Sequence, residues 1–367
     1  MEQPARLRTV LPNGATVLVE RVPGASRVWT RLFLSARGAE DTPATHGFRH
    51  LLEHLVATGR DGRLDGRLER EGAFLNADTL RDVTAFGVDA PAAKLDLALG
   101  ALGEMLQLRS LTPDDIAREV GIIRQEGALM EPSTRLSTAA WSSAYGVQGL
   151  SPFGDLAAMR AATPAAISAL HARLCAGPNL VIVIAGDVDL DRATAAAASV
   201  VRAAPKTVGS WAVRPAGKGG EAEATGLGEA RALPVPAYDE PRTVAALAAA
   251  LSIASEGDDM FVTYTPSVRP GMVMLGRSGE SSGMGARIEG AQAPNLWPRA
   301  RRLAEAWLRR QTGDPGLNAS LRGLLLAQSA DATPDRMREA IAAMTYPQFE
   351  AAVAALKGPG AVRVVGE

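Results

Sequence analysis

The sequence is poor in cysteine: Cys175 is the single one among 367 residues. One cysteine excludes an internal disulfide and fits a reducing compartment, which favours a cytoplasmic location. Cys175 comes just before the apolar run at residues 179–185. We therefore expect a thiol that is buried as a small apolar group, and only in the rarer case a nucleophile.

A strong charge of one sign and long apolar runs are also missing. Lys and Arg number 39 against 40 Asp and Glu, which gives a formal net charge of −1. This balance gives no reason to expect binding to nucleic acid or to an anionic membrane. No apolar run approaches the length of a transmembrane helix, and residues 1–8 lack the apolar core of a secretory signal. The composition, 47% apolar and 22% charged, is that of a globular protein, and the length suggests two domains.

Histidine is scarce as well, yet two of the four histidines stand close together. His50 and His54 are four residues apart, so both lie on one face if the segment is a helix. Glu53 follows His50 by three residues and shares that face. Two imidazoles at this spacing can bind one zinc ion, and a neighbouring carboxylate can take a proton from a water molecule that the zinc activates. The order H-x-x-E-H is the inverzincin signature.

The apolar flanks of this motif predict a largely buried helix over residues 47–58, with its polar edge toward a cavity. Two histidines on one helix face are often simply packed and hydrogen-bonded, which is the alternative interpretation. In a chain with so few histidines, a chance pairing at ligand spacing with glutamate between them is rare, roughly one in several hundred. The motif therefore favours a zinc site.

A second helix carries the candidate third ligand. Residues 112–115, Thr-Pro-Asp-Asp, are typical of a helix start: a capping hydroxyl, proline at the first position and two acids at the positive end. Glu119 and Glu126 follow, seven residues apart and on one face of that helix. Two histidines and one carboxylate leave the fourth zinc position open for water, so Glu126 is the candidate ligand. From periodicity alone, a glutamate at this place is more often a solvated residue.

The chain has the pattern of two related α/β halves. A helix expected from Thr163 precedes a buried strand over residues 179–187, and a helix expected from Thr345 precedes a strand over residues 361–367. Each helix is followed by a Gly-Pro break before its strand. A repeat of this kind indicates that one supersecondary unit occurs twice.

We divide the chain accordingly into three parts. Residues 1–212 are the N-terminal half with the zinc motif, and residues 231–367 are the C-terminal half, which lacks it. Between them, residues 213–230 are rich in glycine and alanine with scattered charges, which predicts a flexible linker.

Taken together, these features resemble the pitrilysin-type zinc metallopeptidases, particularly the branch with mitochondrial processing peptidase and its bacterial relatives. The resemblance covers about residues 7–205. The residues that carry it are 11–14, 47–54, 59, 72, 76–77, 79, 82, 84, 118–120, 126, 178–180 and 185–187.

The resemblance implies an α+β fold of two similar half-domains that close like a clamshell around an extended peptide. It implies His50, His54 and Glu126 as ligands of Zn²⁺ and Glu53 as the general base. The family pattern thus overturns the interpretation of Glu126 as a solvated residue. It also implies Glu119 as a carboxylate outside the ligand set that helps to orient a ligand.

The resemblance further assigns residues 74–77 to the edge strand that pairs with substrate. Main-chain hydrogen bonds to an extended peptide make such a site sensitive to extendedness more than to side chains. Asn76 and Ala77 are therefore the candidate substrate-binding residues. Without the family pattern, Asn76 would be an ordinary loop or strand-end residue.

Departures from the family pattern concern the second half, which looks shortened. The family's second half carries a Gly-rich segment followed by an Arg and a Tyr that hold the substrate backbone. Residues 279–287 are only a faint echo of it, with no tyrosine after them, and a loop is expected there. We therefore expect a heterodimer, in which a homologous subunit without the zinc motif supplies the missing pair. A homodimer is the alternative.

The sequence thus predicts a zinc-dependent endopeptidase, the catalytic subunit of a processing complex. The expected substrates are short or unstructured peptides, or the leader segment of a precursor. The alternative is a non-catalytic binding or assembly subunit on the same fold. The complete ligand set favours the enzyme, because such subunits usually lose ligands. A zinc hydrolase on an unrelated fold would require the resemblance to be accidental.

Overall fold

The computed structural model describes residues 5–226, 228–279 and 283–366, which form two compact units. Unit 1 comprises residues 1–127, 152–212 and 311–331. Unit 2 comprises residues 128–151, 213–310 and 332–367. Each unit is a sheet with helices on both faces.

Among the described residues, unit 1 has six strands, in the spatial order β1-β2-β6-β3-β5-β4. Their bounds are β1 Arg6–Val10, β2 Thr16–Arg21, β3 Arg27–Ser35, β4 Phe74–Thr79, β5 Val83–Pro91 and β6 Leu180–Gly186. A hairpin with Asn13 and Gly14 in its turn joins β1 to β2, and Gly14 has a φ of 90°. The central strand β6 is buried along its whole length, as its continuous apolar sequence predicts.

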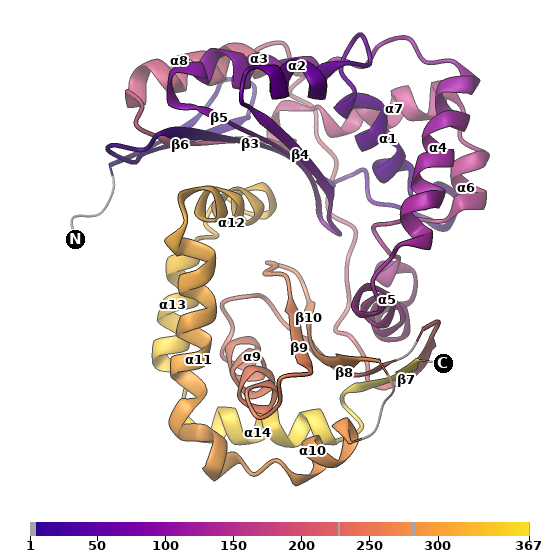
Figure 1. Cartoon of the computed structure of the whole chain (residues 1–367), viewed down its shortest axis with the longest axis vertical. Helices are drawn as coiled ribbons and strands as arrows, with labels where there is room; N and C mark the ends of the chain where they lie inside the picture. Colours follow the sequence, from indigo (N-terminus) through magenta and orange to yellow (C-terminus); the bar gives the residue numbers. More distant parts are fainter. Residues whose placement is uncertain (1–4, 227, 280–282, 367) are drawn as a thin grey trace. The chain divides into compact units, whose positions relative to one another are not determined.

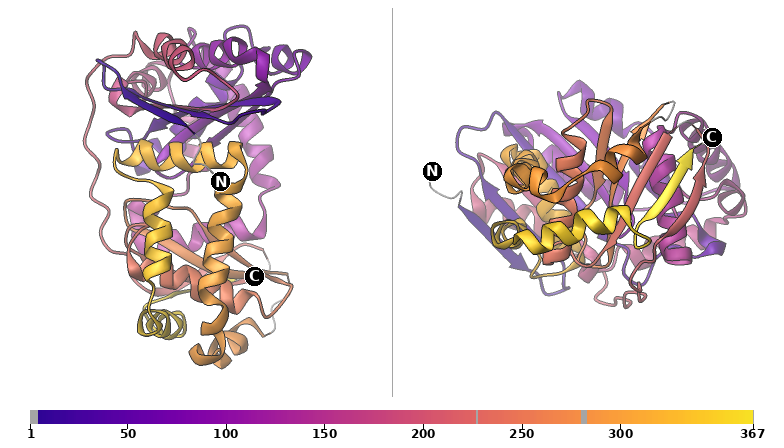
Figure 2. Two further views of the ribbon diagram at one scale, coloured as in Figure 1. Left: turned by 90° about the vertical axis from the view of Figure 1, so that its left-hand side faces the viewer. Right: turned by 90° about the horizontal axis from the view of Figure 1, so that it is seen from below.

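The helices of unit 1 cover both faces of this sheet. Their bounds are α1 Phe48–Ala57, α2 Leu64–Arg70, α3 Leu95–Met105, α4 Pro113–Ala128, α6 Leu156–Arg160, α7 Pro164–Leu174, α8 Leu190–Val201 and α12 Pro315–Gln328. Figure 1 shows α8, α3 and α2 along one face of the sheet and α12 along the other, and the left view of Figure 2 agrees. A layer of apolar side chains from the sheet and from α1, α3, α7 and α8 fills the space between the sheet and the first group of helices.

Helix α12 lies very close to the sheet of unit 1. A side chain at Gly323 would collide with the ring of Phe33, because an added Cβ would stand 1.9 Å from Cε2 of that ring. Asn318 donates to the buried carboxylate of Glu20 at 3.1 Å. Close packing and a buried polar contact together fix α12 on this face.

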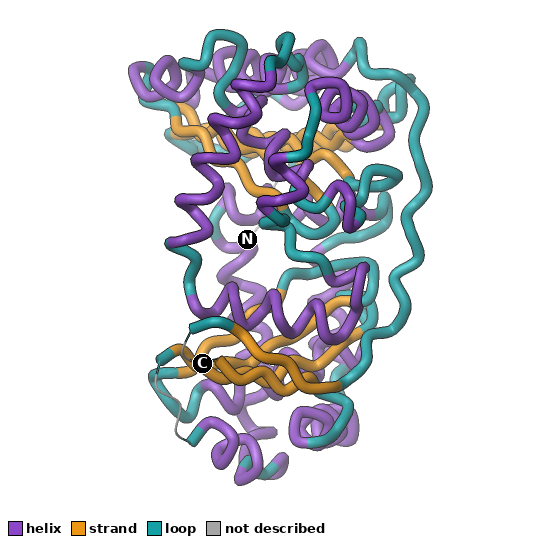
Figure 3. Tube along the Cα trace, turned by 90° about the vertical axis from the view of Figure 1, so that its right-hand side faces the viewer, coloured by secondary structure: helices purple, strands orange, loops and turns teal. Residues whose placement is uncertain are grey.

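Unit 2 has the same kind of organisation. Its described strands are β7 Gly220–Ala224, β8 Gly228–Val235, β9 Met260–Tyr264, β10 Gly271–Ser278 and β11 Val362–Gly366. Its helices are α5 Pro132–Tyr145, α9 Pro241–Ala254, α10 Met284–Gly290, α11 Ala293–Gly313, α13 Pro334–Ala343 and α14 Tyr346–Lys357. Helix α5 contacts β7, β8, β10 and β11, and α9 contacts β8, β9 and β10. Figure 3 shows strands and helices segregated into layers in this unit.

The two sheets share one topology. The order β2-β6-β3-β5-β4 of unit 1 matches the order β7-β11-β8-β10-β9 of unit 2. In both, the first pair is parallel and the next three pairs are antiparallel. The repeat expected from the sequence is thus present in the described strands, with β6 and β11 as equivalent strands that follow α7 and α14.

The two units nevertheless differ from the expected division at residues 213–230. Helix α5, from the first half of the sequence, belongs to unit 2, and α12, from the second half, belongs to unit 1. The two halves of the chain therefore exchange one helix each. Strand β7 and the start of β8 also lie within the segment expected to be a flexible linker, and extended loop fills residues 202–219 (Figure 3).

Two further findings concern single segments. Of the expected loop at residues 279–287, residues 280–282 lie outside the described part, and α10 begins at Met284. Among the described residues, no helix is both long and apolar enough to cross a membrane.

Candidate metal centre

The predicted zinc motif forms helix α1, as expected. Gly47 caps its start with a φ of 93°, a conformation that favours glycine. There is also no room for a side chain, since a Cβ at Gly47 would lie 2.6 Å from Cε of Met159 and 2.9 Å from Cα of Gly154. Leu51 and Leu55 are buried on the opposite face. The polar edge of α1 therefore faces away from the core.

Helix α4 supplies the two glutamates. Its start is fixed by a reciprocal pair of contacts: Thr112 N–H donates to Asp115 Oδ2 at 2.9 Å, and Asp115 N–H donates to Thr112 Oγ1 at 3.2 Å. Glu119 then lies buried against α1, and Glu126 lies two turns further along, partly exposed. The capping sequence thus sets which face of α4 meets α1.

The three predicted ligands converge. Nε2 of His50 and Nε2 of His54 lie 3.3 Å apart, and Oε2 of Glu126 lies 3.6 Å from the first and 3.5 Å from the second. Ligand atoms held about 2.0–2.1 Å from one zinc ion in tetrahedral geometry are separated by about 3.3–3.4 Å. The triangle therefore has the size of a zinc site.

The chemistry of these atoms also fits a cation. Nδ1 of His50 lies 2.9 Å from the carbonyl oxygen of Phe153, which can only accept, so Nδ1 carries the proton and Nε2 keeps its lone pair. Nδ1 of His54 faces the buried carboxylate of Glu119 at 3.7 Å. When both histidine rings are neutral, their Nε2 lone pairs and the carboxylate of Glu126 therefore converge on one position, which a metal ion could occupy. Three acceptors that converge without a donor are stabilised by a metal ion.

The histidines differ in protonation. Burial lowers the pKa of His50, so its ring is readily neutral. Burial acts in the same direction on His54, but the contact with Glu119 and the charge of Glu126 outweigh it and raise the pKa. The contact with His54, followed by one with Arg118, lowers the pKa of Glu119. Glu119 thus stays ionised and can hold His54 by its outer nitrogen, the role that the resemblance implied.

Glu53 lies beside the triangle and is 7% exposed. Burial raises its pKa to about 7, against the hydrogen bond from Thr79, whose Oγ1–H donates to Oε2 at 2.6 Å. A carboxylate with a pKa near neutrality is suited to accept and return a proton. Thr79 was part of the motif quoted from the sequence, but its role becomes visible only in the structure.

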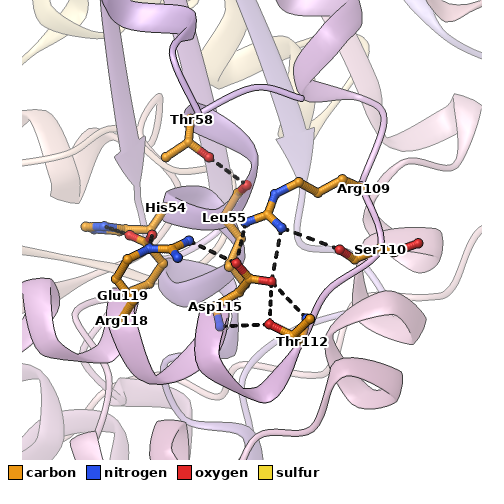
Figure 4. A network of polar contacts seen from close by, with 9 residues as sticks. All are labelled: His54, Leu55, Thr58, Arg109, Ser110, Thr112, Asp115, Arg118 and Glu119. Carbon is orange, nitrogen blue, oxygen red and sulfur yellow. Dashed lines mark hydrogen bonds and ion pairs between the residues drawn. The ribbon is translucent and has the colours of Figure 1, made fainter. Parts of the chain in front are cut away.

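A polar network behind His54 was not predicted. Figure 4 shows Arg118 between two carboxylates: its Nε donates to Glu119 at 3.2 Å and its Nη2 donates to Asp115 at 3.0 Å. Arg109 donates two further hydrogen bonds to Asp115, at 3.0 and 2.8 Å. The Arg109 guanidinium, together with Thr112, holds the pKa of Asp115 well below its usual range. The network ties the start of α4 to the carboxylate that faces His54.

The candidate substrate-binding residues lie on β4, the edge strand of the sheet. Asn76 is exposed and donates to Asp78 Oδ2 at 2.7 Å, and Ala77 is half-buried on the opposite face. Among the described strands, β4 pairs with β5 alone. The strand ends at Thr79, the partner of Glu53. The structure thus joins the end of this edge strand to Glu53, and Asn76 and Ala77 lie on the same strand.

Comparison with known proteins shows what the part of the chain with these features is similar to. Residues 16–149 match the insulinase family, peptidase family M16. The chain is 35% identical over 173 residues to coenzyme PQQ synthesis protein F of Klebsiella pneumoniae, which is 42% of this chain and 23% of that protein. It is 33% identical over 127 residues to the mitochondrial-processing peptidase subunit beta of Caenorhabditis elegans, 34% of this chain and 28% of that protein. A zinc protease of Mycobacterium leprae is 23% identical over 196 residues, 51% of this chain and 44% of that protein.

Solved structures match the whole chain. A protease from Helicobacter pylori has a TM-score of 0.83 at 15% identity and covers 99% of this chain and 100% of its own. A peptidase M16 inactive domain from Pseudomonas fluorescens has a TM-score of 0.74 at 18% identity, with 98% of each chain covered. Identities this low show the fold alone.

The fold is therefore that of the M16-like peptidases, a mixed fold of helices and strands in two related halves, as predicted. Residues 16–149 match peptidase family M16, which agrees with the resemblance seen in the sequence. The matched stretch spans about a quarter of the length of the first two curated relatives. Peptidase activity and zinc dependence are supported at the level of the family.

Proposed function

We propose that this chain is a zinc-dependent endopeptidase and the catalytic subunit of a peptide-processing complex. One observation carries the proposal: the three acceptor atoms of His50, His54 and Glu126 form a triangle with sides of 3.3, 3.5 and 3.6 Å. The family match supports it, because zinc proteases are among the relatives. The fourth corner of such a site is left for water or substrate.

The residues of the chain divide the work as follows. Zinc bound at the triangle supplies Lewis-acid chemistry: it lowers the pKa of water and polarises a carbonyl group. Glu53 takes the proton of the attacking water and returns it to the leaving amine. Thr79 holds one oxygen of Glu53 at 2.6 Å, which leaves the other oxygen for that water. Glu119 keeps Nδ1 of His54 outward and its Nε2 toward the ligand position.

We further propose that the substrate is a short or unstructured peptide, or the leader segment of a precursor. The free edge of β4 can accept an extended peptide as an additional strand, with Asn76 and Ala77 in contact with it. Strand addition requires a substrate without stable structure, because its main-chain groups must be free to pair. A folded protein would be cleaved only at exposed, extended segments.

A homologous subunit without the zinc motif is the proposed partner, and a homodimer is the alternative. The sequence of this chain has no Arg and Tyr pair at the family spacing, and residues 279–287 offer only an echo of it. The name of one relative, subunit beta of a processing peptidase, is in keeping with an assembly of different subunits. The single cysteine leads us to propose a cytoplasmic location.

The second candidate is a non-catalytic binding or assembly subunit. It is favoured by one observation, the match to a structure described as an inactive M16 domain. The two candidates differ in whether the purified chain cleaves anything. We would load the chain with zinc, verify the metal content, and measure cleavage of a quenched, unstructured peptide with and without a motif-lacking homologous subunit. Absence of cleavage in both cases would support the non-catalytic role.

Replacing the general base separates chemistry from metal binding. We expect Glu53→Gln to retain zinc with a Kd within a few-fold of the wild type and to lower kcat by about 10²–10⁴-fold, the usual contribution of general acid–base catalysis. Glu69→Gln is the matched control, since Glu69 is an exposed glutamate of α2. Peptidase activity that survives in Glu53→Gln would contradict the assignment.

A further inference from the structure

A short loop at residues 153–155 touches the start of α1 at three points. Gly154 packs on Gly47 so closely that a Cβ on Gly154 would lie 2.2 Å from Cα of Gly47. The N–H of Asp155 donates to the carbonyl of His46 at 3.2 Å. The carbonyl of Phe153 accepts from Nδ1 of His50 at 2.9 Å. The loop therefore fixes both the helix start and the tautomer of the first ligand.

The ring of Phe153 connects this loop to the other ligand helix. Its centroid lies 5.2 Å from that of the His50 ring. A Cβ at Gly127 would stand 2.9 Å from Cζ of the same ring, so Phe153 also packs against the residue that follows Glu126. One aromatic side chain thus contacts the first ligand and the backbone beside the third.

Glu126 needs such a contact because of its place in the helix. Helix α4 ends at Ala128, so Glu126 lies in the last turn, where helices fray, and its side chain is 46% exposed. The chain also leaves unit 1 directly after Gly127 and re-enters it at Pro152. Packing at this point therefore bears on where the helix holds Oε2 of Glu126, near the two imidazoles.

We propose that Gly127 and Phe153 are positioning residues. They pack against each other where the chain leaves unit 1 and re-enters it, and this contact sets the distance between His50 and Glu126. This inference rests on the proposed zinc site and goes beyond it. Neither residue is a ligand. A side chain at position 127 would displace the Phe153 ring, which packs on the ring of His50.

The test measures zinc affinity, by competition with a chromogenic chelator, independently of catalysis. We expect Gly127→Ala to weaken zinc binding by about tenfold or more, the usual effect of disturbing a group that supports a ligand. Gly121→Ala is the matched control: it is in the same helix, and no atom lies within 4 Å of its added Cβ. Both changes replace glycine by alanine in α4 and add the same helix propensity, so thermal unfolding without zinc measures separately what the contact with Phe153 costs the fold.

A compensating change tests the cause. Phe153→Leu makes room for the new methyl group and keeps the carbonyl at position 153, so the double variant Gly127→Ala/Phe153→Leu should bind zinc more tightly than Gly127→Ala, at about the affinity of Phe153→Leu. Phe153→Leu alone should weaken binding, because the ring no longer packs on His50 and Gly127. If Gly127→Ala folds poorly, the zinc affinity of Phe153→Leu alone still tests whether the ring contact matters.

The outcomes separate this inference from the proposed function. If the wild type fails to bind zinc, the zinc site itself is wrong. If the wild type binds and Gly127→Ala binds equally well, the positioning role is overturned. It is also overturned if the double variant shows no recovery, because the loss would then not come from the contact with the Phe153 ring.

Discussion

Glu53 owes its pKa to two opposing contacts at a single side chain. Burial raises the pKa to about 7, and the hydrogen bond from Thr79 lowers it. A general base must be ionised, so we expect kcat/KM to rise with pH through about 7 and to be lost below it.

Removing the hydroxyl of Thr79 should shift the pH at which kcat/KM rises, the acid limb of the pH profile. Thr79→Val takes away the donor that favours the charged form, so the pKa of Glu53 rises and the acid limb shifts to higher pH. The expected shift is about one pH unit, since a hydrogen bond to a charged group is worth about 1.5–3 kcal/mol and one pKa unit corresponds to about 1.4 kcal/mol. The measurement is kcat/KM against pH.

Thr84 provides the control for this change, because it is the cross-strand partner of Thr79. Its hydroxyl is buried and has no hydrogen-bond partner within the described residues. We expect Thr84→Val to leave the pH profile in place and to be neutral or stabilising. A shift of equal size in both variants would show that the profile does not report on the contact with Glu53.

The candidate site residues on α1 could be predicted from the sequence for a simple reason. His50, His54 and Glu53 lie within one helical turn and a half, where spacing determines geometry. The carbonyl of Phe153, by contrast, is a backbone group that any residue could supply, and its contact with His50 spans 103 positions. No local sequence pattern predicts such a contact.

At the scale of elements, α4 depends on the charges at its start. Asp115 accepts from Arg109, Thr112 and Arg118 and is buried. We expect Asp115→Asn to lower the free energy of unfolding by about 1–3 kcal/mol, because several donors lose a charged acceptor in a buried site. Urea unfolding at pH 7 measures it.

The sign of the pH dependence follows from the lowered pKa of Asp115. A carboxyl group with a depressed folded-state pKa contributes stability above its unfolded pKa of 3.8, and this is lost as the pH falls through the folded value. The difference in the free energy of unfolding between the wild type and Asp115→Asn should therefore become smaller only in strong acid. Asp114→Asn is the control: Asp114 is exposed, so only the helix-dipole contribution of about 0.3–1 kcal/mol should be lost.

Local sequence patterns predicted α1, α4, α7, α14, β6 and β11, but not the partners of these elements. The capping sequence at Thr112 gave the start of α4 correctly. Strand β7 was missed because the alternation of glutamate and alanine over residues 221–224 is weakly apolar, and β7 is held by pairing with β11, 142 positions away. The amphipathic patterns of α5 and α12 indicate a buried face but not which sheet buries it.

At the scale of the whole molecule, the exchange of α5 and α12 governs how the chain can be divided. A fragment of residues 1–212 lacks α12, so the apolar face formed by Leu18, Phe33, Val181 and Val183 would be left open. We expect this fragment to bind a hydrophobic dye and to unfold without cooperativity, in contrast to the full chain. Dye fluorescence and thermal unfolding by circular dichroism measure the two properties.

A peptide of residues 311–331 should reverse part of this effect when it is added to the fragment. The matched control is the same peptide with Gly323→Leu, since a side chain at this position collides with Phe33. Equal binding of both peptides, or dye binding by the full chain as strong as that of the fragment, would contradict the assigned role of α12.

The shared topology of the two sheets and the exchange of α5 and α12 also bear on how this two-unit chain could have arisen. Helices α5 and α12 follow α4 and α11, and each covers the sheet of the unit to which the other half of the chain contributes most strands. Two half-length chains that exchanged this helix would cover both sheets in the same way. Duplication and fusion of a gene for such an intertwined dimer would give this chain directly. The modern protein then preserves, within one polypeptide, the contacts of two ancestral molecules.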